Sequence, residues 1–393
     1  MTMRPPRPAV AAALAAVAAL ALTACAGRAA TTRVPPVGDV DRPPATTLPA
    51  LRRLVADGAP GAASLVTRGG RFGASRFSTA GVADVRTGRR MAAGDHFRAG
   101  SLTKTVVATV VLQLVAEGRL SLRDSAAAHL PRGVPVSGRN GADLRKVTVH
   151  QLLDHTSGLY NYTDDPRLAR RLSGTGFRTH RYDRYSPAAL LRIALDHPPS
   201  AAPGARYTYS NTNYLVLGLI IRAVTGHPYA TEIRRRVLVP AALYDTSFPG
   251  TDPGLPAPHG RAYSQVGDRR VDTTYLDPSR AGAAGEMVTT LGDLNRFFAA
   301  LLGGKLLAPR QMAEIRSEKA THGAYGLGLY ATELPCGVTV WGHNGDINSS
   351  FAQTAGTADG RHLVSYRVNT DAPAARAHGT DVLTAEFCAA RRG

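Results

Sequence analysis

The chain has 393 residues, of which 44% are hydrophobic, so it is long enough to bury a large core in one or two domains. Its formal net charge is +18, and only four of its 47 basic residues are lysines: Lys104, Lys146, Lys305 and Lys319. The arginines are scattered along the chain in pairs. This pattern argues against a nucleic-acid-binding protein and favours a solvated basic surface with weak attraction to an anionic cell wall.

The first 25 residues have the features of a signal peptide. Arg4 and Arg7 precede a run of small and apolar residues, 9–22, that is shorter than the roughly 20 residues a membrane span needs. Leu22-Thr23-Ala24-Cys25 resembles a bacterial lipobox. We therefore expect an extracytoplasmic lipoprotein held at the membrane only through a lipid on Cys25. The alternative is ordinary cleavage at Ala24-Cys25-Ala26, which would give a secreted protein.

Residues 26–48 are rich in Pro, Thr and Ala and are predicted to be a linker, followed by one folded domain at 49–393. A helix around Leu51 ends at Asp57-Gly58, and strands are expected at 62–67 and 77–82. Apolar periodicity predicts helices at 101–117, 148–154, 187–195, 212–225, 290–302 and 309–316. Further strands are expected at 325–330, 338–343, 350–355 and 362–368, before a closing helix at 374–388. This order suggests one sheet completed from both ends of the chain, with the helical middle inserted as a second lobe.

The most specific local signal is Gly100-Ser101-Leu102-Thr103-Lys104 at the start of the apolar helix 101–117. Residues three apart share a helix face, so Ser101 and Lys104 should point into the same space. Burial and the positive potential of the helix N-terminus would lower the pKa of Lys104, and a neutral lysine can accept the serine proton. The alternative is an ordinary serine N-cap followed by an exposed lysine.

Two weaker motifs follow. Tyr209-Ser210-Asn211 precedes the apolar helix 212–225 and offers a phenol as a proton relay and an amide for a substrate carbonyl. Trp341-Gly342-His343-Asn344-Gly345 lies on a late strand, where His343 would supply a polar or cationic group and Gly345 would let a substrate backbone approach. Taken singly, a turn tyrosine with an asparagine N-cap and a core histidine explain these motifs equally well.

In this order and spacing the three motifs resemble the penicillin-recognising serine hydrolases, namely the secreted actinomycete D-alanyl-D-alanine carboxypeptidases and the class C β-lactamases. The similarity runs from about Leu51 to Cys388 and includes 97–100, 152–159 and 325–329. It implies an α/β (α+β) fold with a five-stranded antiparallel sheet, flanking N- and C-terminal helices and an inserted, mostly helical lobe. It also implies that His155 lies in a structural turn rather than in a catalytic triad.

The resemblance implies a role for each site residue. Ser101 would be the nucleophile, Lys104 and Tyr209 would shuttle protons, and Asn211 would contact substrate. His343, Asn344 and Gly345 would stand in for the Lys-Thr-Gly strand of the family, and the backbone N–H groups of Ser101 and Asp346 would form the oxyanion hole. No cofactor is implied, and the sequence has no zinc-binding motif.

Some positions depart from the carboxypeptidase pattern. Asn344 and Asp346 replace the hydroxyls that would bind a substrate carboxylate, and Tyr330 falls where an arginine is expected. The carboxylate of Asp346 would repel an anionic substrate by about 1 kcal/mol. Residues 348–350, Asn-Ser-Ser, lack the glycine of the family. The acyl-transfer chemistry is less affected by these changes than the peptidase specificity.

Three functions are therefore compatible with the sequence. The first is a D-alanyl-D-alanine carboxypeptidase, expected to be a monomer, that acts on peptidoglycan peptides. The second is a β-lactamase or esterase of the same fold, and the third is a non-catalytic protein that binds penicillin or peptide.

The remaining cysteines, Cys336 and Cys388, would lie in an oxidising compartment and can pair, and the carboxypeptidases have a disulfide at this place. Two buried free thiols are the alternative. A bridge closing about 50 residues would contribute roughly 4 kcal/mol.

Overall fold

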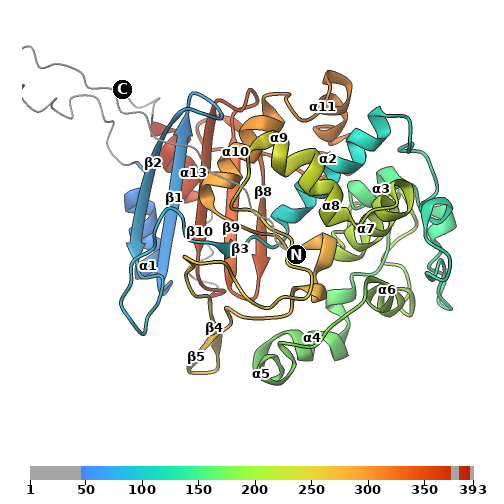
Figure 1. The fold of residues 1–393 in the computed structure, drawn as a ribbon, viewed down its shortest axis with the longest axis horizontal. Coiled ribbons are helices and arrows are strands. Elements are labelled where there is room, and N and C mark those ends of the chain that lie inside the picture. The colour runs from blue at the N-terminus through green and yellow to red at the C-terminus, as the bar shows by residue number, and fades with distance from the viewer. Residues whose placement is uncertain (1–45, 373–379, 390–393) are drawn as a thin grey trace, which may run out of the picture. The chain divides into compact units, whose positions relative to one another are not determined.

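The computed structural model describes residues 46–372 and 380–389, and its centre is a six-stranded antiparallel sheet. The strand order is β2-β1-β10-β9-β8-β7. The strands are β1 (Gly61–Arg68), β2 (Ala74–Gly81), β7 (Tyr330–Glu333), β8 (Thr339–Ile347), β9 (Ser350–Gly356) and β10 (His362–Val368). In Figure 1 the blue N-terminal strands β2 and β1 lie beside the red C-terminal strand β10. The predicted completion of one sheet from both ends of the chain is confirmed.

The sheet has six strands rather than the expected five, and its edge strand lies later in the chain than predicted. Residues 325–329 form a loop, and β7 begins at Tyr330. Gly328 in this loop has a φ of +96°, and a Cβ at this position would lie 2.5 Å from Cβ of Ala108. The loop therefore packs against the helix that follows Ser101, which prevents it from pairing as a strand.

Helices cover both faces of the sheet because β1 is apolar on both sides, with seven of its eight residues buried. Helices α1 (Leu48–Ala56) and α13 (Asp381–Phe387) pack with Val66, Val364 and Tyr366 in one apolar cluster. Helix α10 (Leu291–Leu302) contacts β1, β9 and β10 and belongs to the second, larger cluster. The first seven residues of the predicted closing helix, 374–380, lie before α13, and 374–379 are outside the described residues.

The middle of the chain forms the predicted helical lobe. Its helices are α2 (Leu102–Ala116), α3 (Val149–Leu153), α4 (Pro166–Leu172), α5 (Phe177–His180), α6 (Pro187–Leu195), α7 (Asn211–Thr225), α8 (Tyr229–Ile233), α9 (Val239–Ala241) and α11 (Pro309–Ile315). Two short sheets, β3 (Phe97–Arg98) with β6 (Val288–Thr289) and β4 (Tyr263–Val266) with β5 (Arg269–Asp272), were not anticipated. Helix α2 is apolar on all sides and deeply buried, so it forms the centre of the lobe.

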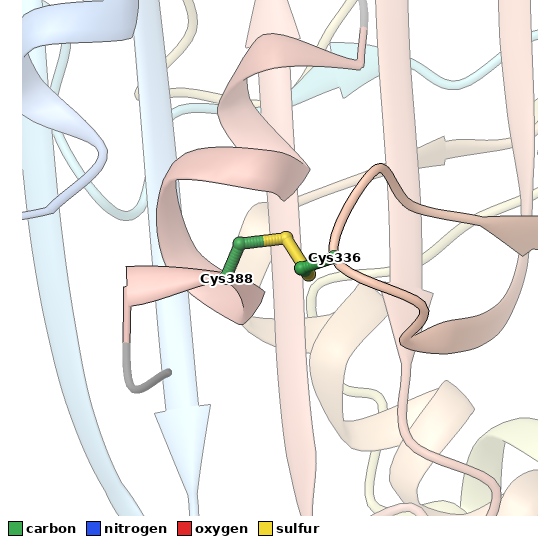
Figure 2. Close-up of a disulfide and its surroundings, with 2 residues drawn as sticks. All are labelled: Cys336 and Cys388. Carbon is green, nitrogen blue, oxygen red and sulfur yellow. A yellow bond between two sulfur atoms is a disulfide. The ribbon is translucent and has the colours of Figure 1, made fainter. Parts of the chain in front are cut away.

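A disulfide joins Cys336, in the turn between β7 and β8, to Cys388, at the end of α13 (Figure 2). The two Cα atoms are 5.8 Å apart, and the bridge spans a sequence separation of 52 residues. It ties the closing helix to the edge of the sheet. Within the described residues, none of the helices is long and apolar enough to cross a membrane. The predicted signal peptide, its Cys25 and most of the predicted linker lie outside them.

Candidate active site

Ser101 lies at the first turn of α2, where this helix meets strand β8. It occupies the N-cap position, but its side chain makes no capping hydrogen bond. The preceding Gly100 has a φ of +53°, and a Cβ there would lie 2.6 Å from the backbone nitrogen of Asp346. Only glycine permits this approach of the helix start to the strand. The half-buried hydroxyl of Ser101 is therefore free of the ordinary capping role.

Lys104 lies one turn further along α2 with its side chain fully buried. Its Nζ lies 2.9 Å from Oγ of Ser101, 2.8 Å from Oδ1 of Asn211 and 2.7 Å from the carbonyl oxygen of Ala284. No ion pair to Lys104 occurs in the described part of the chain. Burial without a counter-charge lowers the pKa of Lys104 well below the ordinary lysine value.

Tyr209 approaches Ser101 from the segment that leads into α7. Its hydroxyl donates a hydrogen bond of 2.7 Å to Oγ of Ser101, and Nζ of Lys104 lies 4.9 Å from the centre of its ring. Burial raises the pKa of Tyr209, so the phenol keeps its proton. Asn211, the first residue of α7, also donates from Nδ2 to Oγ1 of Thr163 at 3.3 Å, which orients its amide. The structure thus brings Ser101, Lys104, Tyr209 and Asn211 into one hydrogen-bonded group.

His155, which the sequence assigned to a turn, lies behind Tyr209. It has a φ of +62° and is buried, and its ring centre is 4.3 Å from that of Tyr209. Its Nδ1 accepts a hydrogen bond of 3.2 Å from the backbone N–H of Ser210. Burial lowers the pKa of His155 well below its usual value, so the ring is neutral. His155 positions the Tyr209 segment, a role that its place in the sequence does not indicate.

His343 belongs to β8, where its side chain is buried and makes both of its hydrogen bonds within the protein. Its Nε2 lies 2.7 Å from the hydroxyl of Tyr325, and its Nδ1 contacts the carbonyl oxygen of Asn344. Burial lowers the pKa of His343 to about 3. Of the two expected roles, a polar or a cationic group, the lowered pKa favours a neutral, polar histidine. The hydroxyl of Tyr325 holds this ring in place, a role that the sequence did not indicate.

Strand β8 presents Asn344 and Asp346 to solvent, while Gly345 between them is buried. A Cβ on Gly345 would lie 1.9 Å from the carbonyl oxygen of Ala99 and 2.8 Å from the backbone nitrogen of Ser101. The close approach at Gly345 is thus to the protein's own backbone. It brings the backbone nitrogens of Ser101 and Asp346 to the same junction, next to the serine hydroxyl.

Two further places where the sequence differs from the carboxypeptidase pattern, Tyr330 and the turn at 348–349, also lie next to β8. The ring of Tyr330, the first residue of β7, lies tilted against that of His343 with ring centres 5.4 Å apart, and burial raises the pKa of Tyr330 to about 12. Asn348 and Ser349 form the turn between β8 and β9 with φ values of 43° and 72°. This left-handed turn is where glycine is favoured, so Ser349 accepts a strained backbone.

The described residues contain no cluster of three or more His, Cys, Asp or Glu side chains that could hold a metal ion. The hydroxyl of Ser101 lies within hydrogen-bond distance of a buried lysine and a tyrosine, where a helix meets an antiparallel sheet. This arrangement is typical of the penicillin-recognising serine hydrolases.

Comparison with known proteins gives the family. The Beta-lactamase family profile matches residues 49–388, and the chain belongs to this family. A crystal structure of a D-stereospecific amidohydrolase from a Streptomyces species is 41% identical, with a TM-score of 0.81 over 88% of this chain and 99% of that one. Penicillin-binding protein 4 of Amycolatopsis lactamdurans is 28% identical over 69% of this chain and 71% of its own length. Esterase EstB of Burkholderia gladioli is 34% identical over 51% of this chain and 49% of its own length.

These relatives carry the names of an amidohydrolase, an esterase and a penicillin-binding protein, and they support the predicted enzyme class, a serine hydrolase. They do not agree on a substrate. The chain matches only about half the length, 53% and 49%, of the first two curated relatives.

Proposed function

We propose that the protein is a serine amidohydrolase that acts on amides of D-amino acids through an acyl-enzyme on Ser101. The observation that carries this proposal is the placement of Oγ of Ser101 within hydrogen-bond distance of both Nζ of Lys104 and the hydroxyl of Tyr209. An ordinary helix cap would not recruit a fully buried lysine. The arrangement is that of an activated nucleophile next to its base.

The hydrogen-bond partners of Lys104 and Tyr209 indicate which of the two groups carries a proton before the reaction. Oδ1 of Asn211 and the carbonyl oxygen of Ala284 can only accept, so they take both N–H bonds of a neutral Lys104 amine. The lone pair of the amine then faces Ser101 and accepts its proton. Tyr209 donates to the same oxygen, and burial keeps its phenol protonated. We therefore assign Lys104 as the base and Tyr209 as the acid of the coupled pair.

In the reaction, Oγ of Ser101 attacks the amide carbon and its proton passes to Lys104. The oxygen of the tetrahedral intermediate is stabilised by the backbone N–H groups of Ser101 and Asp346, at the N-terminus of α2. Tyr209 protonates the leaving nitrogen as the C–N bond breaks, and the proton on Lys104 restores the phenol. Water then hydrolyses the ester on Ser101 by the reverse proton path and releases the free acid.

The substrate class rests on strand β8 and on the 41% identical amidohydrolase. Asp346 is exposed on this strand, where the carboxypeptidase pattern has a carboxylate-binding hydroxyl. A negative charge here disfavours a substrate with a free carboxylate next to the scissile bond. An uncharged amide avoids this repulsion.

The experiment compares kcat/KM for D-phenylalanine amide, L-phenylalanine amide and a peptide ending in D-Ala-D-Ala, with Ser101→Ala as the inactive control. We expect turnover of the D-amide above both other substrates. Replacing Asp346 by Asn should raise kcat/KM for the anionic peptide by about fivefold, the equivalent of about 1 kcal/mol. Asp268→Asn, in the exposed turn between β4 and β5, is the matched control. Turnover of the D-Ala-D-Ala peptide alone would overturn the proposed substrate.

A D-alanyl-D-alanine carboxypeptidase is the second candidate. The observation in its favour is the Cys336–Cys388 disulfide, which lies where the sequence resemblance expects one in these enzymes, together with the penicillin-binding protein among the relatives. A long-lived penicillin adduct on Ser101 by intact-mass measurement would support it. Rapid hydrolysis of the drug would instead indicate a β-lactamase.

We also propose that the protein is an extracytoplasmic monomer anchored by a lipid on Cys25, on the basis of the lipobox-like sequence 22–25. Mass spectrometry of the mature N-terminus tests the anchor. An unmodified N-terminus after residue 26 would show ordinary secretion.

A further inference from the structure

A small cavity is lined by β3, which ends three residues before Ser101, by β10 and by the turn between β8 and β9. Its accessible volume of about 10 Å³ is close to that of one water-sized particle. Arginines from three different segments line it: Arg98 of β3, Arg261 in the loop before β4, and Arg367 of β10. Three cations around a space of this size are unusual, because each needs a counter-charge when it is taken from water.

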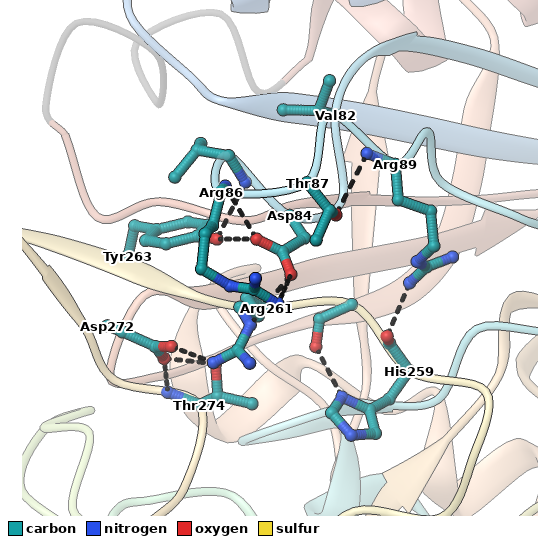
Figure 3. Close-up of polar contacts among 12 residues, drawn as sticks. Val82, Asp84, Arg86, Thr87, Arg89, His259, Arg261, Tyr263, Asp272 and Thr274 are labelled. Atoms are coloured by element: carbon teal, nitrogen blue, oxygen red, sulfur yellow. Dashed lines mark hydrogen bonds and ion pairs between the residues drawn. The ribbon is translucent and has the colours of Figure 1, made fainter.

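Arg261 has its counter-charges. Figure 3 shows its guanidinium between the carboxylates of Asp84 and Asp272, with which it forms two ion pairs. The carboxylate of Asp272 also accepts hydrogen bonds from the hydroxyl and backbone N–H of Thr274. Arg261 is therefore neutralised by the protein itself, and the remaining positive charge at the cavity belongs to the other two arginines.

Arg367 lacks such a partner. Only 3% of it is exposed, and its Nε and Nη1 atoms have no hydrogen-bond acceptor among the described residues. Its guanidinium carbon lies 4.7 Å from the centre of the Phe97 ring, which shields one face. Burial lowers the pKa of Arg367 to about 10 against the attraction of Asp95. The oxygens of Asp95 are, however, already bonded to Arg89 at 3.0 Å and to the backbone N–H of Ala92 at 3.1 Å.

Arg98 contributes a second unpartnered group. Its Nε and Nη2 atoms donate to backbone carbonyls, including those of Thr274 at 3.3 Å and Leu276 at 3.1 Å, but its buried Nη1 has no acceptor. Arg98 is 3% exposed. Two buried arginines thus line this cavity, and each has at least one N–H group without an acceptor among the described residues.

We propose that this cavity binds a small monovalent anion of the size of chloride, held between Arg98 and Arg367. An anion satisfies both the unpaired N–H donors and the charge of Arg367, which forms no ion pair among the described residues, whereas a water molecule satisfies only the donors. The site is separate from the serine hydroxyl. It adjoins the catalytic strand, because Asn348 of the β8–β9 turn lines the cavity and Ser350 donates a hydrogen bond of 2.7 Å to the carbonyl oxygen of Arg98.

A substitution at Gly260 can fill the cavity while leaving Arg98 and Arg367 in place. Its φ is outside the left-handed region, and a Cβ would lie 3.4 Å from Nη2 of Arg367 and 3.4 Å from Cβ of Ala83. Alanine at this position should therefore be accommodated and should occupy space next to the guanidinium. Gly260→Ser would extend further into the cavity and offer Arg367 a hydroxyl acceptor in place of the ion.

The experiment measures the Tm of the full chain as chloride or bromide is added at constant ionic strength, with gluconate as the balancing anion. At 100 times its Kd, a halide bound only to the folded state should raise the Tm by about 4 °C, with saturation. Gly260→Ser and Arg367→Met should abolish this shift. Arg52→Met, at an exposed arginine on α1, should keep it.

Crystals soaked in bromide provide the second readout. We expect an anomalous peak in the cavity within hydrogen-bond distance of the Arg367 guanidinium, and no such peak in Gly260→Ser. A cavity filled by water alone, or a Tm shift that is the same in wild type and Gly260→Ser, would overturn the proposal. Arg367→Met is not needed for this decision if it fails to fold, since Gly260→Ser retains both arginines.

Discussion

Replacement of Lys104 by methionine separates the chemistry of the site from its contribution to stability. Methionine has a similar length and fits a buried, apolar position, but it removes the amine that lies 2.9 Å from Oγ of Ser101. General-base catalysis contributes about 10² to 10⁴ in rate, so kcat/KM for the amide should fall by this factor. Lys305→Met, at an exposed lysine, is the matched control and should leave kcat/KM unchanged.

The pH dependence of the wild type follows from the lowered pKa of Lys104. The neutral amine is the active form, so kcat/KM should fall as the pH is lowered through this pKa. Stability should change in the same direction. Between the folded-state pKa and the ordinary value of 10.5 the unfolded chain binds a proton that the folded chain does not, so the free energy of unfolding rises with pH across this interval.

Lys104→Met removes that titration. The Tm of the variant relative to wild type should therefore decrease as the pH rises from the folded-state pKa of Lys104 toward 10.5. The assay combines ammonia release from D-phenylalanine amide with calorimetry at several pH values. A variant with wild-type turnover, or a Tm difference that does not depend on pH, would refute the assignment of a neutral Lys104.

Three further changes test the surrounding structure. Tyr209→Phe removes the phenol that donates to Ser101 and should lower kcat by about 10² with little change in Tm, measured in the same assay. Gly345→Ala would place a Cβ 1.9 Å from the carbonyl oxygen of Ala99, so both Tm and activity should fall, and an unchanged Tm would contradict the close approach. The double replacement of Cys336 and Cys388 by serine should lower the free energy of unfolding by about 4 kcal/mol in denaturant titrations, with the active site intact.

The sequence is most informative where local pattern and packing agree. The apolar periodicity of 101–117 and 212–225 predicts α2 and α7 nearly to the residue, because Gly118 and Gly226 end them in the left-handed conformation. It is least informative at 325–329. Alternating apolar residues there look like a strand, but the close contact between Gly328 and Ala108 is a tertiary feature that no local pattern contains.

The same distinction applies to the site. The spacing of Ser101 and Lys104 on one helix face can be read from the sequence, because a helix fixes their separation. The roles of His155 and Tyr325 depend on contacts between segments far apart in the chain, and so does the neutral state of His343. Burial decides the protonation of these groups, and burial is a property of the assembled core.

The distribution of burial separates site residues that the core holds in place from site residues at the surface. Lys104 is fully buried on a helix that is apolar on all sides, and Ser101 is fixed by the close approach of Gly100 and Gly345. Changes here disturb the core itself. Asn344 and Asp346 are exposed on β8, near the same serine, so we expect substitutions there to disturb the core less. Under the proposed function, acyl-transfer chemistry depends on buried groups and substrate choice on exposed positions of β8. Such a division would let relatives with the names of amidohydrolase, esterase and penicillin-binding protein share one architecture with different substrates.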